Sequence, residues 1–414
     1  MSRVERPAPA EDVQAVAERR RAARALLRHP LLHADGPGAD DLRLVRRHRA
    51  ELERLFADGL GYRLIVEPTA ARLMKSGLGR DAGRPLLRRS GRPFGPRGYA
   101  LLCLTVAALG RSRTQLLVDE LVAQVRSAAV DAGIDVDLDA IADRRALYAA
   151  LSALVDLGVL HERDGDLEHW AEQRTASLLD VRRDRLPLLV SAALGGLEQP
   201  GDLLDVAALP SASGGARVAV RRRLVESPVL ATADLPEEQA EWWRRNRNRE
   251  RVWFADRFGL ELEIRAEGAI AVDPAGELSD VEFPGGGSAR QFALLLLEQL
   301  ADASRPAARE REAADRTWMR VGRDVVVETA EAVRGRWGRG LKREHREDPA
   351  AALADATAVL ADSGLIRIEP DGGWSIHAAA ARYTVQASIT ESGGTGPERT
   401  EPRNQQSLFG QEDG

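Results

Sequence analysis

Three arginine-rich stretches carry the residue types that contact nucleic-acid phosphates. Residues 242–249 read WWRRNRNR, a basic run that begins with two aromatic side chains, and residues 334–346 hold a second run around Trp337. Cationic side chains neutralise phosphates and aromatic rings stack on bases, so both runs are typical of nucleic-acid contact. The third stretch is a segment over residues 77–98 that is rich in glycine, proline and arginine. The DNA-contact candidates are Arg88, Arg89, Arg92, Arg97, Arg244, Arg245, Arg247, Arg249, Arg336, Arg339, Lys342 and Arg343.

Contacts of this kind would position the protein along a duplex backbone without reading its sequence. A second interpretation stays open for each run, in which the tryptophans are core anchors and the arginines are merely solvated. The net charge of -5 argues against a uniformly basic DNA-binding surface, although it allows local basic patches. Arginine abundance by itself is weak evidence, because the chain has almost no lysine and this reflects genomic base composition.

The sequence offers no arrangement of side chains that predicts catalysis. The nearest approach to a phosphate-binding loop, residues 335–342, has its lysine separated from the last glycine. His29 and His33 have a four-residue spacing, but Pro30 lies between them and breaks the helix that a metal site would need. Cys103 is the only cysteine and is expected in the core of an apolar helix. We therefore predict a protein that is not an enzyme, with no catalytic residue, no metal and no cofactor.

The C-terminal stretch from residue 386 has few apolar residues and is expected to be disordered. It contains a segment, QQSLF, that resembles the bacterial sliding-clamp-binding pentapeptide, with Gln405, Ser407, Leu408 and Phe409 at the motif positions. Such a motif implies docking of an extended peptide into a hydrophobic pocket of the clamp. Because five residues also match by chance, the sliding clamp and an accidental match both stay open.

Composition predicts a soluble protein of the cytoplasm. The mean hydropathy is -0.31, and the longest apolar runs, such as residues 99–109, are too short to span a bilayer. The first residues mix acidic and basic side chains and lack the apolar core of a secretory signal.

A helix followed by a glycine and a hairpin occurs twice and sets the expected organisation. In residues 142–166, leucines at helical spacing precede Gly158, and we expect a strand from Val159 that returns at Leu167. The pattern recurs 206 residues later, with Gly364 as the second stop. Earlier segments recur at shifts of 198 and 193, so we predict a tandem duplication, with chance similarity among helices rich in alanine, leucine and arginine as the alternative.

These repeats predict a mainly α fold with small β-hairpins and a tandem winged-helix architecture. The expected divisions are an N-terminal extended winged-helix module at 1–166, a helical connector and linker at 167–215, a C-terminal extended winged-helix module at 216–385 and the tail at 386–414. The helices in the recognition position carry many acidic residues, such as Asp156 and Asp355. Acidic helices repel phosphate, so these winged helices are expected to bind protein.

The chain resembles the KITE subunits of SMC complexes, and in particular the B subunit of actinobacterial Wadjet systems, which is MukE-like. The resemblance spans roughly residues 20–383 and is strongest before residue 200. It is carried by LLRHPLL (26–32), residues 40–66, ARLMK (71–75) and PFGPRGYALLCLTVAALGR (93–111). It implies a non-catalytic accessory subunit that binds a kleisin, forms a homodimer and helps an SMC-like ATPase act on plasmid DNA, which a Toprim nuclease cleaves.

Two other functional classes compete with this interpretation. A free-standing winged-helix DNA-binding transcription regulator would need a basic recognition helix, and the acidic helices speak against it. A nuclease would need clustered carboxylates beside a lysine, and neither Lys75 nor Lys342 lies in such a cluster.

Overall fold

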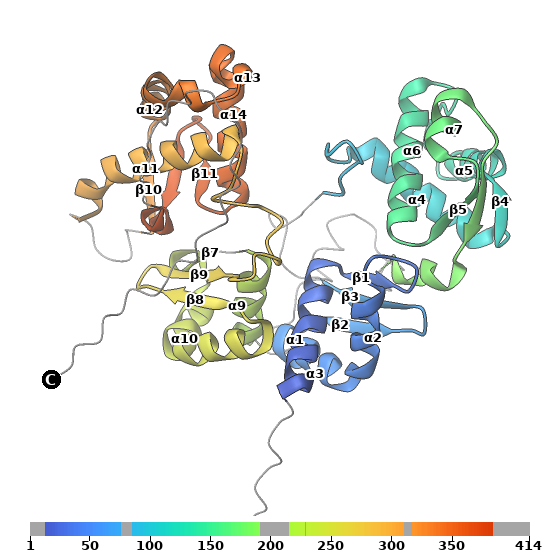
Figure 1. Ribbon diagram of the computed structural model, residues 1–414, viewed down its shortest axis with the longest axis horizontal. Helices are drawn as coiled ribbons and strands as arrows, with labels where there is room; N and C mark the ends of the chain where they lie inside the picture. The colour runs from blue at the N-terminus through green and yellow to red at the C-terminus, as the bar shows by residue number, and fades with distance from the viewer. Residues whose placement is uncertain (1–12, 76–84, 191–214, 228, 310–316, 384–414) are drawn as a thin grey trace, which may run out of the picture.

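The computed structural model is mainly helical, with four small antiparallel sheets of three strands each in the parts that it describes. No helix in these parts is long and apolar enough to cross a membrane. The structure describes residues 13–75, 85–190, 215–227, 229–309 and 317–383. Each sheet belongs to one module, and modules I, II, III and IV are residues 13–75, 85–190, 215–272 and 288–383 (Figure 1).

Modules I and II make up the first half of the chain. The elements of module I are α1 (Val13–Arg28), β1 (Leu31–His33), α2 (Ala39–Arg47), α3 (Arg49–Leu60), β2 (Arg63–Val66) and β3 (Ala70–Met74). Those of module II are α4 (Pro96–Arg111), β4 (Gln115–Leu117), α5 (Val118–Asp131), α6 (Ile141–Asp156), β5 (Leu160–Asp164), α7 (Leu167–Gln173), β6 (Leu178–Val181) and the 3-10 helix η2 (Arg183–Leu188).

Modules III and IV follow a similar order of helices and strands, although module IV has no helix between its last two strands, where module II has α7. The elements of module III are α9 (Gly215–Glu226), β7 (Val229–Ala231), η4 (Thr232–Asp234), α10 (Glu237–Phe258), β8 (Glu261–Ile264) and β9 (Gly268–Val272). Those of module IV are α11 (Ser288–Arg309), β10 (Trp318–Val321), α12 (Arg323–Trp337), η6 (Gly338–Gly340), α13 (Arg343–Glu347), α14 (Pro349–Asp362), β11 (Ile366–Ile368), β12 (Trp374–His377) and η7 (Ala378–Arg382).

All four sheets have the same strand order, in which the last strand of the module lies between the first and the second. The orders are β1-β3-β2, β4-β6-β5, β7-β9-β8 and β10-β12-β11. Modules I and III also share their register at a displacement of 198 residues. Leu31 faces Arg72 as Val229 faces Ile270, and Arg63 faces Met74 as Glu261 faces Val272. The displacement noted in the sequence therefore holds for paired strands.

The apolar cores show how the modules combine. Modules I and III share one core, in which α1 packs on α10 and α3 packs on α9. Modules II and IV each have a core of their own. Figure 1 shows modules I and III side by side, with modules II and IV extending from the same side of this pair. The two halves of the chain are thus joined through their first modules.

Glycines end the helices where the sequence predicts it. Gly158 and Gly364 have φ angles of 67° and 70°, and Gly61 and Gly259 adopt the same left-handed conformation after α3 and α10. A side chain at such a residue would be strained, so glycine is the residue that fits.

Two local expectations are wrong. Leu167 does not begin the return strand but the helix α7, because the Asp166 side chain accepts hydrogen bonds from the backbone N–H groups of Glu168 and His169 and so caps a helix. The return strand is β6, which lies within the range expected to be a helical connector. Cys103 is exposed, because α4 turns Leu101 and Leu104 toward the core and leaves position 103 on its outer side.

Candidate functional site

The helix α10 separates the aromatic and basic residues of the first predicted run. Trp243 is 1% exposed and lies in the core shared by modules I and III, and Trp242 packs against that core. The four arginines of the run lie on the solvent side: Arg244, Arg245, Arg247 and Arg249. Trp243 is therefore a core anchor and is not available to stack on a base, whereas the arginine side chains face the solvent.

The arginines of α10 differ in their partners. Arg244 pairs with Glu237 at 2.8 Å, and Arg245 pairs with Glu241 one turn away. Within the described parts of the chain, no carboxylate pairs with Arg247 or Arg249. These two guanidinium groups are the strongest phosphate-binding candidates of the run, because a phosphate would not have to displace an ion pair.

The second run surrounds the end of α12. Trp337 packs partly against the core of module IV, and the Arg336 guanidinium lies 5.1 Å from its ring centroid. Lys342 pairs with Glu344 at 3.0 Å, and Arg343 pairs with Glu347 at 2.7 Å. Arg339 lies exposed in η6, between α12 and α13. Two of the four candidate cations of this run, Lys342 and Arg343, are thus already matched by a neighbouring carboxylate.

The arginines of the loop before α4 lie against module II. Arg97 forms a two-point ion pair with Asp143 at the start of α6, and this partner holds the pKa of the Asp143 carboxyl below its usual range. Arg89 lies 3.9 Å from Asp156 at the other end of α6. Arg88 and Arg92 belong to the same loop, which an isolated bridge between Leu87 and Pro93 closes. This loop therefore lies along α6.

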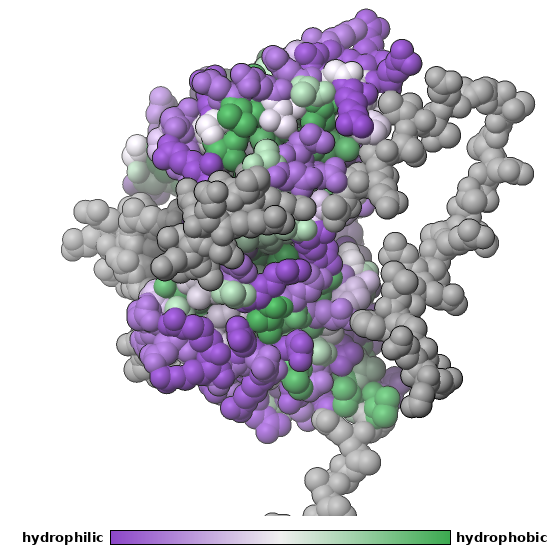
Figure 2. All heavy atoms as spheres, turned by 90° about the vertical axis from the view of Figure 1, so that its left-hand side faces the viewer, coloured by the Kyte–Doolittle hydropathy of each residue, from purple (hydrophilic) through white to green (hydrophobic). Residues whose placement is uncertain are grey.

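The structure does not bring the three basic groups together on one surface. In Figure 1, α10 lies at the far side of module III, whereas α12 and α13 lie at the opposite end of module IV. Figure 2 views modules III and IV from the side and shows hydrophilic residues over most of this face, with small apolar patches between them. The tail residues Gln405, Ser407, Leu408 and Phe409 lie outside the described residues.

Buried charged side chains lie where modules I and III meet, and no pattern in the sequence predicts their burial. The Arg221 and Arg222 side chains of α9 are both buried, as is Glu250 of α10. At the edge of the same interface, the Tyr62 hydroxyl donates to Glu226 at 2.8 Å, and burial raises the pKa of this phenol. Lys75 pairs with the other oxygen of Glu226 at 2.8 Å. Polar contacts therefore link the first half of the chain to the second.

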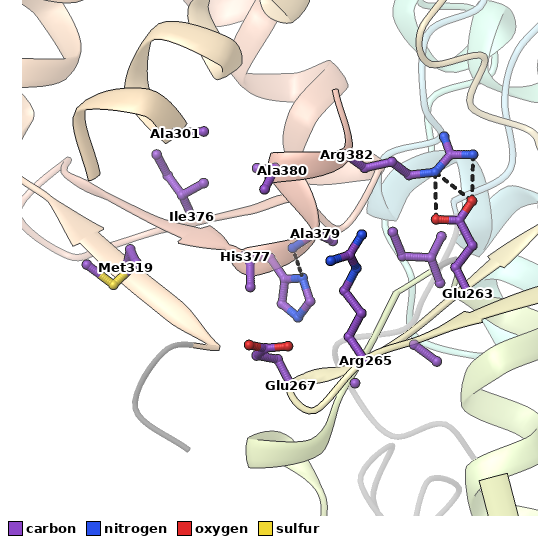
Figure 3. Close-up of a pocket in the computed structure, with 15 residues that line it drawn as sticks. Glu263, Arg265, Glu267, Ala301, Met319, Ile376, His377, Ala379, Ala380 and Arg382 are labelled. Atoms are coloured by element: carbon purple, nitrogen blue, oxygen red, sulfur yellow. Dashed lines mark hydrogen bonds and ion pairs between the residues drawn. The ribbon is translucent and has the colours of Figure 1, made fainter. Parts of the chain in front are cut away.

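A cavity of about 240 Å³ lies between the β8–β9 hairpin and the last sheet. Its walls are largely apolar, with Met319 and Ile376 on one side, while Arg265 and Glu267 reach in from the hairpin turn (Figure 3). The Glu263–Arg382 ion pair, 2.8 Å long, closes one edge. The cavity thus forms part of the junction between modules III and IV.

His377 is the only titratable side chain on the module IV wall of this cavity that is buried. Burial lowers the pKa of His377 to about 4, so the imidazole is neutral near pH 7. Its Nδ1 accepts a hydrogen bond from the Ala379 N–H at 3.0 Å, which places the proton on Nε2. A neutral ring with this low pKa does not act as a base near pH 7. In the described parts of the chain, no group of three or more His, Cys, Asp or Glu side chains could hold a metal ion.

Comparison with known proteins gives one match. A model of the family described as "Protein of unknown function (DUF2398)" matches residues 23–386, a range that includes parts of all four modules. Neither a search of the curated proteins nor a search of the solved structures finds a match.

Proposed function

We propose that this chain, which belongs to the DUF2398 family of proteins of unknown function, is a non-catalytic accessory subunit of an SMC-family DNA-translocating complex that restricts plasmids. In this proposal it is a MukE-like KITE protein of a Wadjet-type antiplasmid defence system. It binds a kleisin-like subunit, and through the kleisin it meets an SMC-like ATPase and the Toprim nuclease of the same system. It contacts double-stranded DNA non-specifically and works in the cytoplasm.

The observation that carries this proposal is the repeated module. Every module has a helix, a strand, one or more helices and two further strands, with α7 inserted between the last two strands of module II, and every sheet has its third strand in the centre. This is the element order of a winged helix, so we interpret the chain as winged-helix modules in two tandem halves. The shared register of modules I and III supports descent of the halves from one duplicated unit.

The helices in the recognition position support binding to protein and argue against reading of DNA. In module II, Ala149 and Ser152 of α6 are buried, and the basic loop already lies along this helix. In module IV, α14 exposes Ala354, Asp355 and Ala358, a small and acidic face. Helix α14 has no cation, and Arg145 is the one exposed cation of α6, so a protein segment fits these surfaces better than the phosphates that flank a major groove.

Co-expression with the products of the flanking genes tests the proposal. We expect a kleisin-like protein to co-purify in size-exclusion chromatography with light scattering. Ala354→Arg places a large cation on the exposed face of α14 and should weaken the complex. Ala50→Arg, which makes the same change on an exposed position of α3, is the matched control and should leave the complex intact.

The alternative is a free-standing winged-helix transcription regulator, and the same preparation distinguishes it. A chain that ignores the neighbouring gene products and binds one DNA sequence much more tightly than others would contradict the accessory-subunit proposal. The sliding clamp, offered to the full chain and to a Leu408→Ala/Phe409→Ala variant, tests the tail motif separately.

A further inference from the structure

Helix α1 of the first half donates hydrogen bonds to the last carbonyl groups of helix α10 of the second half. The last carbonyl groups of an α-helix have no partner within the helix and carry partial negative charge. The Arg24 guanidinium donates to the Phe258 carbonyl at 2.9 Å, and Arg20 donates to the Asp256 carbonyl at 3.2 Å. Arg24 also pairs with Asp273, which follows β9. An arginine of the first half thus caps a helix of the second.

Helix α9 of the second half makes the same contact to helix α3 of the first. Arg222 donates to the carbonyls of Leu60 and Gly61 at 2.5 and 2.6 Å. Arg217 donates to the Asp58 carbonyl at 3.2 Å. The cap on the end of α3 is therefore built from the same kinds of atoms as the cap on the end of α10.

The two contacts are reciprocal at a displacement of 198 residues. Arg222 follows Arg24 by 198 positions, and Phe258 follows Leu60 by the same number. Position i of each half thus contacts position j of the other half. This reciprocity defines the isologous interface of a two-fold symmetric dimer. Here both sides of that interface belong to one chain, and they enclose a single apolar core.

We propose that the two halves of this chain replace the two subunits of a symmetric pair, so that the protein is a monomer and enters any assembly as one copy. The surface that would receive a second copy is occupied by the chain's own other half. A second chain could use this interface only by displacing the first, which would expose the shared core and the buried Arg222. The homodimer expected from the sequence is replaced by a pair within one molecule.

The chain offers a direct chemical test, because Lys75 and Lys342 are its only lysines. A carbodiimide joins a lysine amine to a carboxylate that touches it and adds no spacer. Lys75 lies 2.8 Å from Glu226, so this link would connect the first half to the second. Lys342 lies 3.0 Å from Glu344 at the start of α13, and the link between them reports that the reagent has reacted.

The experiment uses the full chain alone, without DNA or a partner, so its result is independent of the proposed function. Light scattering should give the mass of one chain, 45.0 kDa, over a wide range of concentration. On a denaturing gel, the Lys75–Glu226 link should be found by mass spectrometry in the band of one-chain mass. Glu226→Gln should abolish this link and leave the Lys342–Glu344 link unchanged.

Three results would overturn the inference. The first is a Lys75–Glu226 link in a band of two-chain mass, because the halves would then pair between molecules. The second is a particle of twice the mass in light scattering, whatever surface forms it. The third is the absence of the Lys75–Glu226 link in a sample in which the Lys342–Glu344 link has formed.

Discussion

Arg221 and Glu250 form a two-point ion pair inside the protein, with Nε to Oε2 at 2.6 Å and Nη2 to Oε1 at 3.0 Å. The Glu250 side chain is 1% exposed and the Arg221 side chain 8%. The guanidinium also lies 3.7 Å from the ring centroid of Trp253, which packs against the core shared by modules I and III. Three side chains from α9 and α10 thus satisfy one another away from water.

Removing one partner of this pair should be costly. Glu250→Ala leaves the Arg221 charge buried without a counter-charge, and such changes lower the free energy of unfolding by about 3–5 kcal/mol. The double variant Arg221→Met/Glu250→Leu removes both charges and should lose much less. Urea unfolding followed by tryptophan fluorescence measures both. The exposed pair of Arg245 and Glu241 is the control, and Glu241→Ala should change stability by about 0.2–1 kcal/mol. Equal losses in the two single variants would contradict this account.

Gly59 and Gly335 predict opposite outcomes for the same substitution. Both lie in helices, where alanine is favoured over glycine by about 1 kcal/mol. A Cβ at Gly59 would stand 2.8 Å from the Trp253 ring, whereas a Cβ at Gly335 would have no atom within 4 Å. We therefore expect Gly59→Ala to destabilise the protein by about 1–3 kcal/mol through overpacking and Gly335→Ala to stabilise it. Thermal unfolding measures both, and a stabilised Gly59→Ala variant would contradict the close packing of Gly59 against the Trp253 ring.

The local features of the fold could be predicted because their signals lie within a few residues. Gly158 and Gly364 end helices as expected. The capping of α7 by Asp166 is equally local, but the apolar Leu167 also fits the start of a strand, and the hydrogen bonds of the Asp166 carboxylate decide for a helix.

The buried charges between the halves could not be predicted, because their partners lie far away in the sequence. Arg221 and Arg222 belong to the run RVAVRRRLVE, which resembles a solvated basic helix. Only tertiary packing brings the carbonyls of Leu60 and Gly61 to Arg222. The same reason applies to Trp243, which is buried in the core that α10 shares with module I.

His377 predicts a loss of stability in mild acid. Its pKa of about 4 in the folded protein lies below the ordinary value of 6.5, because burial disfavours the charged ring. The unfolded chain therefore binds the proton first as the pH falls. The contribution of the neutral His377 ring to the free energy of unfolding is complete above pH 6.5 and is lost as the pH falls to about 4. The free energy of unfolding decreases by up to about 3 kcal/mol over this range.

Chemical unfolding at several pH values measures this effect. His377→Gln keeps a neutral polar side chain at every pH and should flatten the dependence between pH 6.5 and pH 4. His169→Gln, which changes an exposed histidine of α7, should leave it as in the unchanged protein. An unaltered slope in His377→Gln would show that other groups cause the acid loss.

Arg247 and Arg249 predict the electrostatic part of DNA binding. Both guanidinium groups are exposed on α10, and no carboxylate in the described parts of the chain pairs with them. Each lost phosphate contact lowers the slope of log affinity against log salt by about 0.9. Arg247→Glu/Arg249→Glu should therefore weaken binding to double-stranded DNA and reduce this slope by about 2.

Fluorescence anisotropy with two duplexes of unrelated sequence measures the affinity over a salt series. Phosphate contacts carry no sequence information, so both duplexes should lose affinity equally. Arg54→Glu/Arg63→Glu makes the same charge change on exposed positions of module I and should have a much smaller effect, because it alters the net charge without removing the α10 arginines. Equal losses in the two double variants would show that net charge governs binding, and a loss confined to one duplex would point to base contacts that the geometry of α10 does not account for.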